Sequence, residues 1–381
     1  MKTLQKYFAS EIVSAVLFTL VAFLALFAFF DLMNELSSVG RGAYKVQHAF
    51  LYVLMGMPGY TYELMPIAVL IGTIVVMAKF SSTSEFTIMR VSSMSTAMAG
   101  WMLVKIGLFF VLVTFIFGEY LSPLASEAAG KFKLQMMGTT IASEFRSGLW
   151  TKDVIKSQGL SGDVMGSRFF NVRKIGSDGE LQGVKLYEFD NDFHMTAMIM
   201  ASSANYQGEH TWLLHNVTET HFSNAVFETE NYANNTAGLS TKKTESKQLV
   251  SDITPGIIGV MFADPDRMSA YDLYAYTKHL AESKQVTERY EIAFWKKLVY
   301  PLAIFVMMAL ALPFAYLQVR SGGVSLKIFV GIMIGVSFHL VNSLFSHIGL
   351  LNTWPALITA AFPSVLYLLI AISALWWIQR H

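Results

Sequence analysis

The most constraining feature of this chain is a stretch of 51 residues, 328–378, that contains no Asp, Glu, Lys or Arg. A helix needs about 20 apolar residues to cross the hydrocarbon core of a bilayer. The stretch is therefore too long for one crossing and long enough for two. Residues 349–355 (GLLNTWP) divide it with turn-forming residues. The pattern predicts two membrane-spanning helices joined by a short turn.

Four further apolar segments have the length of a membrane crossing: 12–30, 58–77, 98–121 and 298–319. The first follows two lysines, as a signal peptide would, but it runs directly into 31–35 (DLMNE) with no small-residue cleavage site. We therefore expect it to remain as a helix, which gives a multi-pass inner-membrane protein with six spans. Basic residues favour the cytoplasmic side, and a cytoplasmic N-terminus places most of them there: Lys2, Lys6, Lys79, Arg90, Lys105, Arg320, Lys327 and Arg380. Both termini are then cytoplasmic, and residues 122–297 lie on the outer side.

Charge is concentrated in that middle segment. Of the 55 charged residues (28 basic and 27 acidic), 39 lie in 122–297, although the whole chain is 54% hydrophobic. The net charge of +1 provides no field for nucleic acid, so we expect no nucleic-acid partner. The absence of cysteine excludes disulfides, thiolate metal sites and cysteine nucleophiles.

The middle segment is typical of short β-strands. Alternating runs rich in β-branched and aromatic residues, separated by turn residues, occur at 168–175, 181–189, 194–202, 211–220 and 225–232. These indicate a β-sandwich or jellyroll. Residues 269–272 (SAYD) then have the form of a capping box that opens a helix. The expected division is 1–125 for spans one to three, 126–265 for a periplasmic β-jellyroll, 266–297 for a helical connector, and 298–381 for spans four to six.

The loop between spans two and three, about 81–93, predicts a short amphipathic helix on the cytoplasmic side. The pattern alone favours a helix that lies on the headgroups; the alternative is a docking helix for a cytoplasmic partner. Its apolar contacts and charged ends are Glu85, Phe86, Ile88, Met89 and Arg90.

Two histidines in span five, His339 and His347, are eight residues apart and near one face of the helix. They can ligate a metal or relay protons. No intramembrane carboxylate accompanies them and the i,i+4 metal spacing is missing, so packing histidines are favoured. The sequence contains no Gly-x-Ser-x-Gly, His-Glu-x-x-His or Gly-x-x-x-x-Gly-Lys-[Ser/Thr] motif. We therefore expect no cofactor or metal on this chain, and any ATP-driven work requires another chain that binds ATP.

Basic residues flank two of the outer span ends: Arg41 and Lys45 after the first span, and Lys296 and Lys297 before the fourth. They are either snorkelling side chains or a basic rim for anionic headgroups, at about 1 kcal/mol each. The pair at 296–297 lies against the positive-inside bias, which favours the rim.

Taken in order, these motifs resemble the LptF/LptG family of lipopolysaccharide-export permeases over essentially the whole chain. The similar segments are 62–72 (YELMPIAVLIG), 84–90 (SEFTIMR), 118–123 (GEYLSP), 147–150 (SGLW), 265–269 (PDRMS) and 289–297 (RYEIAFWKK). The Gly-Leu-Trp at 148–150 favours the LptG branch over the LptF branch.

The resemblance implies the permease subunit of an ABC transporter. It would extract lipopolysaccharide from the outer leaflet and pass it through the jellyroll to LptC-like and LptA-like periplasmic proteins. An LptF-like subunit would pair with this chain in the lipid membrane, and an LptB-like ATPase dimer, coupled through 85–90, would use ATP and Mg. Acyl chains would occupy an apolar cavity that span five can line with Phe329, Met333, Phe338, Leu344 and Phe345. The alternatives are the LptF branch, a permease for another lipid, an assembly factor, and an intramembrane enzyme that uses His339 and His347.

Overall fold

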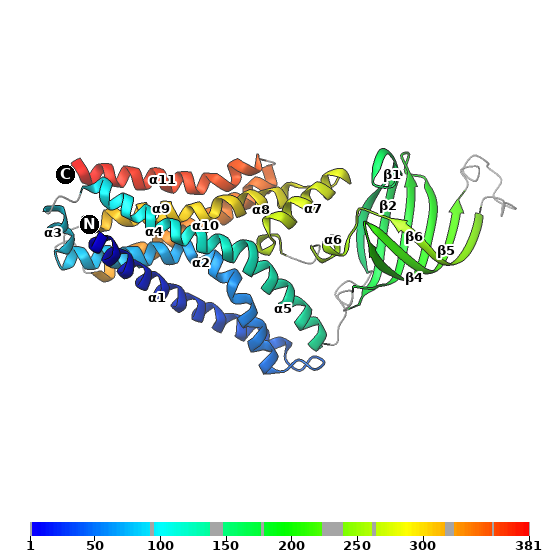
Figure 1. Cartoon of the computed structure of the whole chain (residues 1–381), viewed down its shortest axis with the longest axis horizontal. Helices are drawn as coiled ribbons and strands as arrows, with labels where there is room; N and C mark the ends of the chain where they lie inside the picture. Colours follow the sequence, from blue (N-terminus) through cyan, green and yellow to red (C-terminus); the bar gives the residue numbers. More distant parts are fainter. Residues whose placement is uncertain are drawn as a thin grey trace.

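A computed structural model describes residues 2–91, 95–137, 148–176, 179–222, 239–260, 264–316, 324–352 and 354–380. The chain forms an elongated molecule in which a helical bundle and a β domain lie end to end (Figure 1). Both termini lie at the end of the bundle farthest from the β domain.

Six helical segments of the described chain are long and apolar enough to cross a membrane: Gln5–Ser38, Val46–Ser82, Met98–Met137, Glu288–Ala315, Ser325–Asn352 and Ala356–Trp377. Each overlaps one predicted span, so the fold class of six apolar helices with an inserted β domain is confirmed. The helices of the bundle are α1 (Lys2–Glu35), α2 (Val46–Ser82), α4 (Thr96–Ile116), α5 (Ser122–Met137), α8 (Glu288–Val299), α9 (Ala303–Ala311), α10 (Val324–Asn352) and α11 (Ala356–Arg380).

Two of the spans are built from consecutive helical pieces. Helix α4 continues into α5 through a π-helical turn at Phe117–Leu121. Helix α8 continues into α9 through a 3₁₀ turn at Tyr300–Leu302, whose Pro301 has no N–H to donate to the preceding turn. A second 3₁₀ turn, Leu312–Ala315, follows α9 and contains Pro313.

Helix α2 is the centre of the bundle. It packs against α1, α5, α9 and α10, and its Leu70, Ile74 and Met77 are fully buried. Helices α1, α10 and α11 leave most of their apolar side chains exposed or only partly buried in the single chain. Apolar faces of this extent require lipid or another protein surface rather than water.

The β domain is one antiparallel sheet whose six strands lie in chain order. The sheet curves around its own core (Figure 1), so one sheet encloses apolar side chains without a second sheet facing it. Its core includes the fully buried Trp212, whose Nε1–H donates to the Ile253 carbonyl (2.7 Å). The strands are β1 (Leu149–Gln158), β2 (Ser161–Ile175), β3 (Leu181–Asp190), β4 (Met195–Gly208), β5 (Thr211–Phe222) and β6 (Leu239–Val250).

Four of the five predicted strands correspond to β2, β3, β4 and β5. The fifth, 225–232, lies outside the described residues. Strands β1 and β6 were not predicted, because their sequences interleave charged residues and lack apolar alternation. Of the β6 side chains that the structure describes, from Ser240 to Val250, only Leu249 is buried. Both nevertheless pair with a neighbour along nearly their whole length through the backbone.

The connector to the fourth span is helical, with α6 (Pro255–Val260), a 3₁₀ turn at Pro265–Arg267 and α7 (Ala270–Glu282). The predicted helix start is confirmed, with Ser269 as the N-cap: the Asp272 N–H donates to Oγ of Ser269 (3.0 Å). The Asp272 carboxylate accepts from the Ser269 hydroxyl (2.6 Å), so the bond recorded for it differs from that of a full capping box. Helix α7 packs on α8 through Tyr276 and Tyr290, whose ring centroids are 4.7 Å apart. Helix α7 thus lies between the bundle and the β domain (Figure 1).

Candidate functional site

The short helix α3 (Glu85–Val91) lies at the end of the bundle that holds the two termini (Figure 1). Ser84, with a φ of 59°, reverses the chain after α2. Oε1 of Glu85 lies 2.9 Å from Oγ1 of Thr83, and the Tyr7 hydroxyl donates to Oε2 (3.1 Å). A carboxylate in the first turn also suits the helix dipole. Glu85 therefore fixes the start of α3 against α1 within this chain.

Helix α3 has one packed face and one exposed apolar edge. Phe86 is 2% exposed and meets the Tyr316 ring edge-on, with centroids 5.0 Å apart. Met89 packs against the same core. Ile88 and Val91 are 63% and 84% exposed. Arg90 belongs to α3, but its side chain lies outside the described residues. The arrangement presents aliphatic side chains for contact with a partner or with headgroups.

A polar cavity of about 200 Å³ lies between α2, α8 and α10. It brings together two lysines, two carboxylates and an imidazole within a largely apolar bundle. Groups of this kind inside a membrane domain mark a functional site. The lining residues are Tyr62, Glu63, Asp266, Ala293, Lys296, Lys297, Tyr300, His339, Asn342 and Ser343.

Lys297 is the principal cation of this cavity. The residue is 6% exposed, and its Nζ has no hydrogen-bond partner among the described residues. It lies 4.8 Å from the centroid of the Tyr62 ring, a cation–π arrangement. A buried ammonium without a carboxylate partner is costly. The cavity is therefore suited to an anionic group such as a phosphate.

Close packing holds the Tyr62 ring in place. A Cβ on Gly118 would lie 2.5 Å from the Tyr62 ring, so only glycine permits this approach. The Tyr62 and Tyr300 rings are 5.3 Å apart, and the Tyr300 hydroxyl donates to the Glu63 carbonyl (2.6 Å). The aromatic surface under Lys297 is thus fixed by α2, the π turn and the start of the fourth span.

The four predicted headgroup cations do not lie together. Lys296 pairs with Asp266 (3.1 Å), so its charge is balanced, unlike that of Lys297. Arg41 and Lys45 are exposed in the loop between α1 and α2, which Figure 1 shows well away from α8. The Lys45 N–H donates to Nδ1 of His48 and helps to begin α2. The expected rim is therefore divided into two separate places.

The predicted acyl-contacting residues of α10 also separate. Phe329, Met333 and Leu344 are 58%, 51% and 54% exposed. Phe338 is 1% exposed and packs edge-on against Tyr367, with centroids 5.2 Å apart. Phe345 stacks on Phe362 of α11 at 4.4 Å. One apolar face of α10 therefore contains three of the five residues, and the other two pack within the chain.

The two histidines of α10 lie in different surroundings. His339 lines the polar cavity, whereas Nδ1 of His347 lies 3.1 Å from the Ser343 carbonyl. Eight residues of helix separate them by about 12 Å along the axis. No described group brings them to a common ligand.

Glu119 has a contact that the sequence did not indicate. Its carboxylate accepts the Ala270 N–H (2.8 Å) and the Tyr271 N–H (3.5 Å). These are the first residues of α7, so Glu119 attaches the connector to the third span. Glu119 and Ala270 are 151 positions apart in the sequence, so no local sequence pattern predicts their contact.

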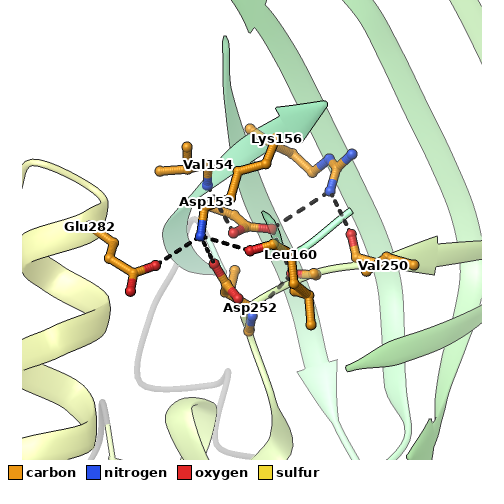
Figure 2. A network of polar contacts seen from close by, with 10 residues as sticks. Asp153, Val154, Lys156, Leu160, Val250, Asp252 and Glu282 are labelled. Atoms are coloured by element: carbon orange, nitrogen blue, oxygen red, sulfur yellow. Dashed lines mark hydrogen bonds and ion pairs between the residues drawn. The ribbon is translucent and has the colours of Figure 1, made fainter. Parts of the chain in front are cut away.

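The β domain meets α7 through a polar network (Figure 2). Nζ of Lys156 on β1 lies 2.9 Å from Glu282 at the end of α7, and 3.3 Å from Asp252. It also donates to the Leu160 carbonyl (3.2 Å). The hydrogen bond from Lys156 lowers the pKa of Glu282, and the bond to Glu282 raises the pKa of Lys156. Both shifts favour the charged pair.

A second part of the network is buried within the sheet. Asp153 is 1% exposed, and its carboxylate accepts from the Ser251 hydroxyl (2.6 Å) and lies 3.6 Å from Nη1 of Arg168. Nε of Arg168 donates to Glu188 (2.7 Å). Burial raises the pKa of Asp153, against the lowering effects of Ser251 and Arg168. The base of the β domain is therefore a connected set of charges facing α7.

These features together define a polytopic membrane protein with an inserted β domain fixed to a helical connector and a polar cavity inside its bundle. A profile described as "Lipopolysaccharide export system permease LptF/LptG" matches residues 6–380. The chain is 26% identical over 378 residues to the lipopolysaccharide export system permease protein LptG of Escherichia coli K12, covering 99% of this chain and 98% of that protein. It is 27% identical over 377 residues to LptG of Haemophilus influenzae, with the same coverage. The chain therefore belongs to the LptF/LptG family of lipopolysaccharide export permeases, which are multi-pass inner-membrane proteins.

Proposed function

We propose that this chain is the LptG-type permease subunit of a transporter that extracts lipopolysaccharide from the outer leaflet of the inner membrane. The observation that supports this most is the family match over 6–380, together with relatives named LptG that align over 98% of their own length. The lipopolysaccharide then passes to the β domain and to a periplasmic bridge.

The proposed orientation has both termini and α3 in the cytoplasm and the β domain in the periplasm. The distribution of basic residues along the sequence supports it. An LptB-like ATPase dimer hydrolyses ATP with Mg and contacts α3, where Ile88 and Val91 form the exposed edge. An LptF-like subunit pairs with this chain, and LptC-like and LptA-like proteins receive the substrate.

The proposed substrate path uses two chemically different surfaces. The exposed α10 face of Phe329, Met333 and Leu344 is apolar and contacts acyl chains. The cavity beside it contains the buried Lys297 and binds a headgroup phosphate. A lipid with acyl chains and phosphates requires both surfaces. The acyl chains need an apolar surface, and a phosphate that leaves water needs a cation as a partner.

Photocrosslinking in an active complex tests the substrate assignment. Benzoylphenylalanine at Met333 is expected to give an ATP-dependent lipopolysaccharide adduct. The same group at Phe338, which is buried in the core of this chain, is the matched control and is expected to give much less. Failure of position 333 to form any adduct in a complex that transports lipopolysaccharide would refute the proposed path along α10.

The LptF branch and a permease for another lipid differ from this proposal only in partner and substrate. Copurification with an LptF-like subunit, rather than with an LptG-like one, separates the two branches. The enzyme alternative requires His339 and His347 to act together. The purified wild-type complex is expected to leave the substrate chemically unchanged, as analysed by mass spectrometry, whereas the enzyme alternative predicts a modified product that is lost when either histidine is replaced by glutamine.

A further inference from the structure

A groove of about 310 Å³ lies between α1 and α4, and it shares no residue with the polar cavity. Its walls are mainly apolar, and they include Ala9, Val13, Met102 and Phe109. Gln5 and Lys105 are its polar lining residues. An apolar groove that contains one cation is unusual inside a membrane-spanning segment.

The packing of α4 explains why Lys105 faces outward. A Cβ on Gly107 would lie 2.9 Å from the Phe305 ring, so this side of α4 is pressed against α9. Lys105 is two residues earlier, about 200° around the helix, and its side chain is exposed. Among the described residues no carboxylate pairs with it. Lys79, on the neighbouring α2, is by contrast paired with Glu11 (2.7 Å).

Lys105 lies in the first half of α4, toward the cytoplasmic headgroups in the proposed orientation. An exposed ammonium at that level attracts an anionic lipid headgroup. An extended peptide in the groove would leave backbone N–H and C=O groups unsatisfied in hydrocarbon, and an apolar helix would supply no anion for Lys105. A phospholipid supplies a phosphate and an apolar chain in one molecule. We infer that the groove binds an anionic phospholipid of the membrane, with its phosphate on Lys105 and an acyl chain along Ala9, Val13 and Phe109. This site is separate from the proposed substrate path.

Native mass spectrometry of the full chain tests this inference. The chain is equilibrated with equal amounts of phosphatidylglycerol and phosphatidylcholine, and the retained lipids are counted. Wild type is expected to retain phosphatidylglycerol with about fivefold preference, the factor for one cation near a headgroup. Lys105→Gln is expected to lose the preference and Lys105→Arg to keep it.

Two further variants separate a built site from diffuse charge. Lys6→Gln removes an exposed cation near the start of α1 and is expected to leave the preference unchanged. Ala9→Trp keeps Lys105 but fills the groove, and it is expected to reduce retention of both lipids; Val13→Phe serves if that variant does not fold. Equal losses from Lys6→Gln and Lys105→Gln, absence of preference in wild type, or retention of lipopolysaccharide in place of phospholipid would each overturn the inference.

Discussion

At the scale of single residues, His279 makes the junction between α7 and the β domain sensitive to pH. The side chain is 7% exposed, and its Nε2 has no partner among the described residues. Burial lowers the pKa of His279, although Asp153, Asp252 and Glu282 act in the opposite direction. The fold therefore favours the neutral ring over the charged one, relative to the unfolded chain, whose ring takes up a proton near pH 6.5.

This linkage gives the first prediction. The contribution of His279 is fully present above pH 6.5 and is lost as the pH falls below it, because the unfolded state then binds the extra proton. The loss is up to about 1.4 kcal/mol one pH unit lower. Hydrogen exchange of α7, corrected for intrinsic rates, is expected to show it, and His279→Gln to abolish it. His194→Gln, at an exposed histidine, should leave the pH dependence intact; an unchanged profile in His279→Gln would contradict the assignment.

Lys156 is the residue on which the same junction most depends. Lys156→Met leaves Asp252 and Glu282 without their cation at a site where the lysine side chain is only 15% exposed. We expect a loss of about 1–3 kcal/mol in the stability of the junction. Limited proteolysis of the connector measures it, with Lys243→Met on the exposed face of β6 as the control. Equal cleavage of the two variants would contradict the prediction.

Glu282 contributes less than Lys156, because its side chain is 38% exposed. An exposed partner limits the effect of Glu282→Gln to about 0.5 kcal/mol. The pKa of Glu282 is lowered in the fold, so its contribution exists above its unfolded pKa and is lost as the pH falls through the folded one. The pH sensitivity of Glu282 therefore lies well below that of His279.

At the scale of elements, the buried and exposed faces of α3 allow folding to be tested separately from the proposed partner binding. Phe86→Ala removes a ring that is 2% exposed and is expected to cost about 3–5 kcal/mol of local packing. Ile88→Asp changes a side chain that is 63% exposed and is expected to leave the fold intact while weakening association with the ATPase at least tenfold. Thr87→Ala, at an exposed neighbour, is the control. Copurification measures association and thermal unfolding measures the fold; retained association in Ile88→Asp would argue against docking through α3.

The α10 residues show how much of the candidate site could be predicted from the sequence. Met333 and Leu344 are eleven residues apart, which returns to within about 20° of the same face. Phe338 is five residues from Met333, about 140° around, and it is buried. Helical periodicity was therefore sufficient to place Met333 and Leu344 on one face of α10 and Phe338 on another. The prediction grouped them because it used their hydrophobicity alone. Spans and central strands were predictable for the same reason, since each has a strong local pattern.

Other features depend on contacts between distant segments and have no local pattern. Strands β1 and β6 exist because their backbones pair with neighbours, although their side chains are largely polar. The isolation of Lys297 depends on Asp266 pairing with Lys296 instead. The sequence showed two adjacent lysines and could not distinguish them. The sequence shows which positions carry a charge. It does not show which of these charges is balanced by a residue far away in the sequence, as Lys296 is by Asp266.

At the scale of the whole molecule, α7 is the mechanical link between the bundle and the β domain. Its first residues are held by Glu119 of the third span, and its last residue by Lys156 of the sheet. Its middle packs on α8, which continues into the fourth span. A displacement of the bundle can therefore reach the β domain through one rigid helix, a form of rigid-body coupling.

Glu119→Ala is predicted to uncouple the β domain from the helical bundle without impairing ATP hydrolysis by the partner ATPase. The first N–H groups of α7 then lose their carboxylate, a partner favoured by the helix dipole, while the Ser269 cap remains. In the assembled complex, ATP hydrolysis is expected to continue near the wild-type rate, and lipopolysaccharide transfer to the β domain to fall about fivefold or more. Glu127→Ala is the matched control, because Glu127 lies on the same continuous span and only pairs with the exposed Lys131. Equal transfer by the two variants, with unchanged exchange at the start of α7, would show that the link through Glu119 is not used.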